Sequence, residues 1–188
     1  DPSLKHLAAL EGWDGAWPNT PNSDFLAVVE ANLGGMKSDR YFKRDVQYRL
    51  ITDEVYGQHT FNLTGEVTIN LLHYGIENVP LSGNYSGYFR VYVPKGSKLI
   101  SVNDAYKADV VESDEGDFHV FGDIVKLKPG ERTTLTYRYS LPQNILNTNV
   151  YNLNIIRQSG TDNDHYSAIF QAPQGYRIRS TNFTQHEN

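Results

Sequence analysis

The amino-acid sequence predicts a mainly β protein, an antiparallel β-sandwich of immunoglobulin-like or related topology with a short N-terminal helix. Aromatic residues make up 12% of the 188 residues, with 13 Tyr and a single Met, and this composition favours strands over helices. Residues 61–71 alternate between apolar and polar side chains, which is typical of an antiparallel sheet with one buried side. Short segments of this kind recur between turn residues without interleaved helices, so a sandwich is expected and a closed β-barrel is the alternative.

Residues 1–22 are predicted to form a helix and a Trp-rich connector, both packed on the sandwich. Asp1 is a suitable N-cap, and Pro2 fits the first helical position. A helix of about ten residues is not stable alone in water, so we expect it to dock on the sheets. Trp13 and Trp17 stand among turn-forming residues, where we expect them to pack as a plug; a carbohydrate-stacking or partner-binding surface is the alternative.

The β-sandwich domain is predicted over residues 23–180. It opens with the apolar run 25–29, which predicts a buried strand. Further strands are expected at 41–52, 61–71, 88–93, 98–102, 108–112, 117–121, 124–127, 133–141, 151–158, 166–171 and 176–180. The polar residues 181–188 are expected to form a loose tail.

The loop that follows the first strand is the candidate interface of the domain. It contains Asn32, Gly34, Gly35, Lys37 and Asp39. A pair of glycines lets backbone amides approach a partner closely. A phosphate site would require a helix directly after this loop, whereas a strand is expected there, so the pattern favours an interface over a phosphate site.

A second candidate surface lies on the predicted strand 88–93. Tyr88, Arg90 and Tyr92 alternate along it and therefore share one face, where they would offer an aromatic platform beside a cation. Together with the two Trp residues they form the candidate glycan-stacking set. The competing interpretation is that these tyrosines pack beneath a loop or the N-terminal helix.

Composition and motifs exclude several classes of function. A net charge of −5 with scattered basic residues argues against nucleic-acid binding, and the lack of cysteine excludes disulfides and cysteine nucleophiles. The six histidines are dispersed and no catalytic motif is present, so the sequence predicts no catalytic residue, no cofactor and no metal ligand. The acidic turns 113–117 and 162–164 do not match a calcium-binding loop, although calcium there stays open. No apolar run is long enough to span a membrane.

Several blocks of the sequence carry a resemblance to a known family. They are EGWDG at 11–15, DFLAVVEANLGGMKSD at 24–39 and YFRVYVPKGS at 88–97, followed by shorter matches at 129–131, 137–142 and 157–161. Through these blocks nearly the whole chain resembles the C-terminal region of the bacterial domain of unknown function 4012 family. Glu30 stands where that family usually has Asp, which keeps the carboxylate.

The resemblance implies an extracellular protein of the bacterial cell surface or envelope, anchored through segments that precede this chain. It supplies no catalytic residues, and it implies the upstream region as a partner. Our leading hypothesis is therefore a non-catalytic structural or interaction module, with cell-wall glycan or another surface protein as further partners and no direct membrane insertion by this segment. The alternatives are a carbohydrate or cell-wall-polymer binding module and a catalytic domain acting on glycopolymers, which would need a cleft with converging acids.

Overall fold

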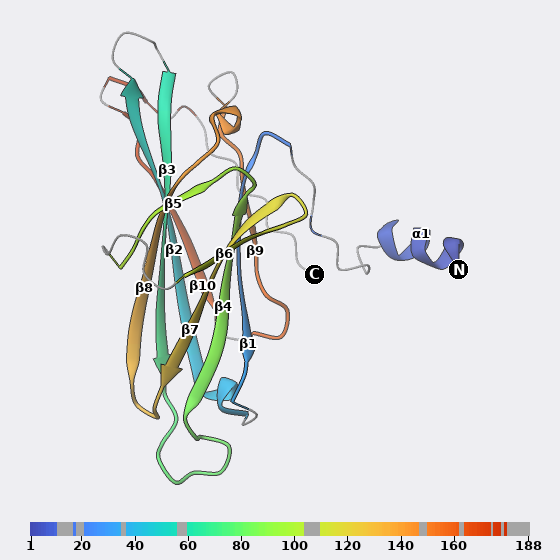
Figure 1. Cartoon of the computed structure of the whole chain (residues 1–188), viewed down its shortest axis with the longest axis vertical. Coiled ribbons are helices and arrows are strands. Elements are labelled where there is room, and N and C mark those ends of the chain that lie inside the picture. Colours follow the sequence, from blue (N-terminus) through green and yellow to red (C-terminus); the bar gives the residue numbers. More distant parts are fainter. Residues whose placement is uncertain are drawn as a thin grey trace.

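A computed structural model describes residues 1–10, 17, 21–34, 37–55, 60–103, 110–146, 150–161, 164–173, 175–177 and 179. Within these residues, ten strands form two five-stranded sheets that pack face to face (Figure 1). The predicted β-sandwich is confirmed, and the sheets do not close into a barrel. The elements are α1 (Pro2–Leu10), β1 (Asp24–Asn32), η1 (Lys37–Tyr41), β2 (Phe42–Val55), β3 (Thr60–His73), β4 (Tyr85–Pro94), β5 (Lys98–Val102), β6 (Val111–Glu115), β7 (Phe118–Leu127), β8 (Arg132–Ser140), η2 (Gln143–Ile145), β9 (Leu153–Ile156) and β10 (His165–Phe170).

The strand order is β6-β7-β4-β1-β9 in one sheet and β10-β2-β3-β8-β5 in the other. This differs from the ABED and CFG orders of an immunoglobulin domain, so the sandwich has a related topology instead. Most neighbouring strands are antiparallel, but β9 runs parallel to β1 and β10 parallel to β2. The segment 157–164 connects these two edge strands and so links one sheet to the other.

The core lies between the sheets and follows the predicted alternation. On β3, the side chains of Leu63, Val67, Ile69 and Leu71 are buried, as expected from the apolar positions of that strand. Tyrosines fill much of the remaining space: the largest fully buried side chains include Tyr48, Tyr85, Tyr137, Tyr139, Phe89 and Phe121. Tyr is therefore a core residue of this sandwich as well as a surface one.

The main strand that differs from the prediction is β7, which runs without a break through Gly122 and Asp123. The sequence predicted two strands there, at 117–121 and 124–127. A Cβ at Gly122 would lie 2.0 Å from the hydroxyl oxygen of Tyr88, so this glycine makes room for a ring from β4 and does not mark a turn. At the predicted last strand, Tyr176 instead donates its backbone N–H to the carbonyl of Pro173, at 3.0 Å, in a turn.

The N-terminal helix forms as predicted but does not make the expected docking contact. The backbone N–H of Ser3 donates to the Asp1 carboxylate at 2.8 Å, as an N-cap requires. Leu4, Leu7 and Leu10 are all exposed, and Figure 1 shows α1 apart from the sheets. In the described part of the chain, no helix is long and apolar enough to cross a membrane. The predicted tail 181–188 lies outside the described residues.

Candidate functional site

A fully buried carboxylate, Asp24 on β1, connects the two sheets. It accepts hydrogen bonds from the hydroxyl groups of Tyr48 on β2 and Tyr151 before β9, and from the backbone N–H of Phe25. Burial raises the pKa of Asp24 to about 6, although the three hydrogen bonds act in the opposite direction. Its hydrogen bonds to residues of both sheets hold the sheets together. Because the side chain has no access to solvent, a substrate cannot reach this carboxylate.

A second buried group surrounds Arg44, which the alternation of β2 places on the inward side. Its guanidinium forms an ion pair with Asp164, and its Nη1 atom lies 3.8 Å from the Glu30 carboxylate. Gln158 completes the group, since its side chain exchanges hydrogen bonds of 2.8 and 3.0 Å with the backbone of Glu30. Burial raises the pKa of Glu30, while Arg44 lowers it. We call Glu30, Arg44, Gln158 and Asp164 the Arg44 cluster; it fastens the 157–164 connection between the sheets.

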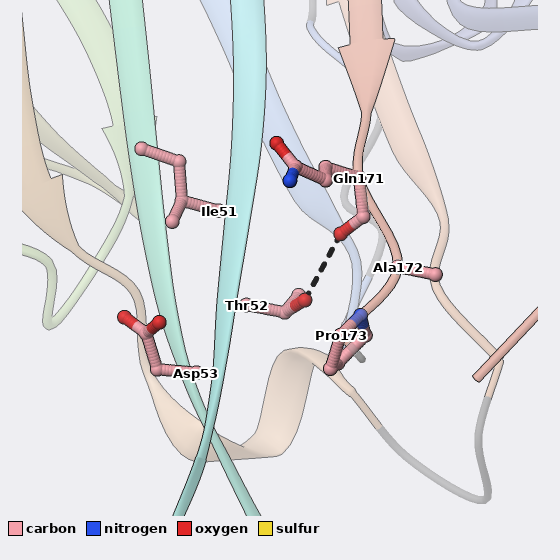
Figure 2. A pocket seen from close by; sticks show the side chains of 6 residues that line it. All are labelled: Ile51, Thr52, Asp53, Gln171, Ala172 and Pro173. Atoms are coloured by element: carbon pink, nitrogen blue, oxygen red, sulfur yellow. Dashed lines mark hydrogen bonds between the residues drawn. The ribbon is translucent and has the colours of Figure 1, made fainter. Parts of the chain in front are cut away.

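Two hollows on the surface offer little for catalysis. The first, about 240 Å³, lies between the end of β2 and the residues after β10, where the Thr52 hydroxyl donates to the Gln171 carbonyl at 3.0 Å (Figure 2). Asp53 is the single acid among its described lining residues, whereas general acid–base catalysis needs a second group. The second hollow, about 230 Å³, has Lys95 and Asp117 as its charged lining residues.

The acidic turn 113–117, where calcium binding was left open, uses its carboxylates in contacts with other side chains. His119 contacts Asp114 at 2.7 Å and Glu112 at 3.1 Å, and the hydrogen bond from His119 lowers the pKa of Asp114. Glu115 accepts a hydrogen bond from the Tyr92 hydroxyl. Among the described residues no group of three His, Asp or Glu side chains fits a metal ion. Of the other acidic turn, Asp164 is paired with Arg44 and the remaining residues lie outside the described part.

The candidate glycan-stacking residues are largely used in packing. The ring of Trp17 lies 5.4 Å from that of Phe25, 4.7 Å from that of Tyr92 and 5.3 Å from that of Phe118. The plug predicted for Trp17 is thus confirmed, and Tyr92, only 5% exposed, has no free ring face for a sugar. Trp13 lies outside the described residues.

The other two members of that set are constrained as well. Arg90 lies over the ring of Tyr92 with its Cζ atom 5.4 Å from the centroid, and its Nη1 atom is 3.6 Å from the Glu115 carboxylate. Tyr88 is half-buried across Gly122. The flat platform predicted from the alternation of β4 is therefore replaced by a packed cluster, because Trp17 covers one end of it.

The candidate interface lies at one end of the sandwich, the lower end in Figure 1. Asn32 closes this loop by accepting a hydrogen bond from the Gly34 backbone at 2.9 Å and donating to Asp39 at 3.2 Å. Lys37 and Asp39 are exposed, and Gly35 lies outside the described residues. The predicted interface residues that the structure describes are thus brought together.

The β3–β4 loop, residues 74–84, lies at the same end and exposes apolar side chains. Ile76 is 70% exposed, and Val79 and Leu81 are each 41% exposed. The segment falls between the predicted strands 61–71 and 88–93, where its Pro and Gly residues indicate a loop, but its apolar tip was not predicted. Leu81 has a φ of +68°, a conformation that aliphatic side chains rarely adopt. We call the described residues of 32–43, 74–84 and 128–132 the loop end.

Hydrogen bonds connect the three segments of the loop end. The Tyr74 backbone donates to the Tyr41 carbonyl at 2.8 Å, and the Tyr74 hydroxyl donates to the Arg40 carbonyl at 2.7 Å. The Gly130 backbone donates to the His73 carbonyl at 2.8 Å. These bonds place η1 beside the start of the loop and the β7–β8 turn beside His73, the residue that precedes the loop.

Buried His73 holds the base of the β3–β4 loop. Its Nδ1 atom accepts from the Gly75 N–H at 3.1 Å, and its Nε2 atom donates to the Gly83 carbonyl at 2.8 Å. Since an N–H only donates and a carbonyl only accepts, these partners assign the neutral tautomer with the proton on Nε2. A Cβ at Gly75 would lie 2.1 Å from the Ser82 hydroxyl oxygen, so a larger residue would force this base apart. The clamp fixes the loop with its apolar tip outward.

Replacing His73 by Phe should release the loop. The ring would still fill the site, but the Gly75 N–H and the Gly83 carbonyl would lose their partners, which we expect to lower the free energy of unfolding by about 2 kcal/mol. Urea unfolding measures this change, and limited proteolysis should show faster cleavage within 76–81. His165→Phe is the matched control, because that histidine is exposed; an equal effect of both variants would contradict the clamp.

Comparison of the chain with protein-family models, with curated proteins and with solved structures found no match in any of the three. The family resemblance of the sequence blocks therefore stays a prediction.

Proposed function

We propose that this chain is a non-catalytic interaction module of a bacterial cell-envelope protein and that it binds its partner through the loop end. The observation that carries the proposal is the outward display of Ile76, Val79 and Leu81 by a hydrogen-bonded loop. Apolar side chains gathered on an exposed loop are costly in water unless they are covered by a partner, and loops on a rigid scaffold are common binding elements.

The placement of the ionisable groups supports a non-catalytic role. Asp24 and Arg44 are buried, Glu30 and Asp164 are half-buried beside Arg44, and the acids of the β6–β7 hairpin contact His119, Arg90 and Tyr92. Catalytic acids and bases instead need to meet a substrate in an accessible cleft. In this protein the groups whose pKa values are shifted hold strands together.

The extracellular location in this proposal rests on the sequence resemblance alone. An upstream region of the same protein, cell-wall glycan and another surface protein are the partners that the resemblance suggests. The loop end adds a physical criterion, since the partner must cover an apolar tip flanked by charged side chains.

Site-specific photocrosslinking tests the proposal. A photo-reactive side chain at position 76, introduced into the protein in cells that produce it, should give crosslinked products. Position 124 on β7 is the matched control, because Ile124 is also exposed, at 56%, but lies outside the loop end. Equal crosslinking from both positions, or none from position 76, would overturn the loop end as the binding surface.

A further inference from the structure

The geometry of the loop end points to an anionic lipid surface as its partner. This inference rests on the proposed interaction function and names the class of partner. The β3–β4 loop would enter the headgroup layer with its apolar tip while cations around its base meet the lipid phosphates. Such contact is peripheral, and it replaces the sequence-based expectation that the segment makes no direct membrane insertion.

The placement of the apolar side chains favours a layer over a peptide. Ile76, Val79 and Leu81 are exposed on the β3–β4 loop and are not among the lining residues of the two hollows described above, which lie toward the other end of the sandwich. A projecting apolar tip has to enter apolar material supplied by its partner. Tyr74 at the base of the loop is half apolar and half polar, and such rings suit the boundary between lipid and water.

The charge at the loop end is opposite to that of the whole chain. Its exposed ionisable side chains are the cations Lys37, Arg40, Lys43, Lys128 and Arg132 and the acids Asp39, Glu77 and Glu131. The described residues of this end are therefore positive by two charges, although the chain has a net charge of −5. Clustered cations beside exposed apolar residues are the combination that binds anionic membrane surfaces.

The cations are held around the base of the loop by the contacts of the fold. The Lys43 ammonium lies over the Tyr74 ring at 5.6 Å from its centroid, and the Arg40 carbonyl accepts from the Tyr74 hydroxyl. Lys128 and Arg132 flank the turn whose Gly130 donates to the His73 carbonyl. A flat anionic surface that receives the tip would meet cations from η1, β2 and the β7–β8 turn together.

The loop is also ordered before any partner binds. The His73 clamp fixes its base, and the positive φ of Leu81 holds an aliphatic residue in an uncommon backbone conformation while its side chain stays exposed. Strained backbone conformations of this kind are concentrated at functional sites, where the local shape of the chain contributes to binding. A preformed tip loses little conformational entropy on insertion.

Vesicle co-sedimentation of the 188-residue chain tests the inference. We expect binding to phosphatidylglycerol vesicles that weakens with salt, and much weaker binding to phosphatidylcholine vesicles. Ile76→Ser/Leu81→Ser should lower the partition coefficient at least about tenfold, because it removes the apolar tip. Lys37→Glu/Lys128→Glu should lower it by a similar factor, because each reversed charge repels the surface.

Matched variants elsewhere on the sandwich serve as controls. Val111→Ser/Ile124→Ser removes two other exposed apolar side chains, and Lys95→Glu/Lys98→Glu makes the same charge change near the β4–β5 turn. Equal losses in these controls, or no sedimentation with phosphatidylglycerol at low salt, would overturn the lipid partner. If position 76 crosslinks to a protein and the chain does not sediment with vesicles, the lipid partner is overturned and the interaction module stands. If position 76 gives no crosslink and the chain does not sediment, both proposals are overturned.

Discussion

Replacing Arg44 by Ala is expected to lower the free energy of unfolding by about 3–5 kcal/mol, the range found when one partner of a buried ion pair is removed. The variant would leave the carboxylates of Glu30 and Asp164 buried without their cation. It would also free the 157–164 connection that carries the chain between the sheets. Urea unfolding at neutral pH measures the effect.

Arg49→Ala is the matched control, because Arg49 lies on the same strand with an exposed side chain 3.9 Å from Glu66. Exposed pairs of this kind contribute less than about 1 kcal/mol. The loss in Arg44→Ala should also shrink at mildly acidic pH. Arg44 lowers the pKa of Glu30 against the effect of burial, so without Arg44 this carboxylate takes up a proton more readily. Equal losses in the two Arg variants would show that the Arg44 cluster does not hold the sheets.

The strands were predictable because each carries its own periodicity. On β3, apolar and polar residues alternate over eleven residues at 61–71, and that local pattern alone determines which face is buried. The helix start was predictable for the same reason, since Asp1 and Pro2 act within one turn. The failure of α1 to dock shows the limit, because docking depends on a surface that the helix sequence does not specify.

The polar groups between the sheets were not predictable, since their partners are far away in the sequence. Arg44 stands at an inward position of β2, yet its burial makes sense only beside Asp164, which lies 120 residues further on. Asp24 likewise looks like a polar residue before an apolar run, and the tyrosines that bind it lie on β2 and before β9, 24 and 127 residues further on. A buried charge is stable only with such partners, and tertiary structure alone supplies them.

The loop end was predictable in part. The candidate interface after β1 was found from its glycines and polar residues, whereas the neighbouring β3–β4 loop was assigned from Pro80 and Gly83 as an ordinary connection. The apolar residues Ile76, Val79 and Leu81 around Pro80 were a signal that a loop prediction overlooks. Their exposure follows from the hydrogen bonds of His73 to Gly75 and Gly83, which no sequence motif predicts.

The stability of the wild-type protein should fall as the pH rises from about 4 to 7 through the titration of Asp24. Burial raises the pKa of this group from 3.8 to about 6 in the folded state, so between these values the folded protein holds a proton that the unfolded chain has released. The stabilising contribution is complete below the unfolded pKa and is lost as the pH passes the folded pKa. A shift of this size corresponds to about 3 kcal/mol.

Asp24→Asn should remove this contribution. The amide cannot ionise, and it keeps the size of the side chain and an oxygen that accepts from the hydroxyl groups of Tyr48 and Tyr151. The difference in unfolding free energy between variant and wild type, measured in urea at several pH values, should therefore move in favour of the variant by about 3 kcal/mol between pH 3 and 7. Asp53→Asn, at an exposed position of β2, is the matched control for the same change of side chain. A constant difference between Asp24→Asn and wild type across this range would mean that Asp24 does not titrate within it, and that the tyrosine hydroxyl groups stabilise its charge as well as water does.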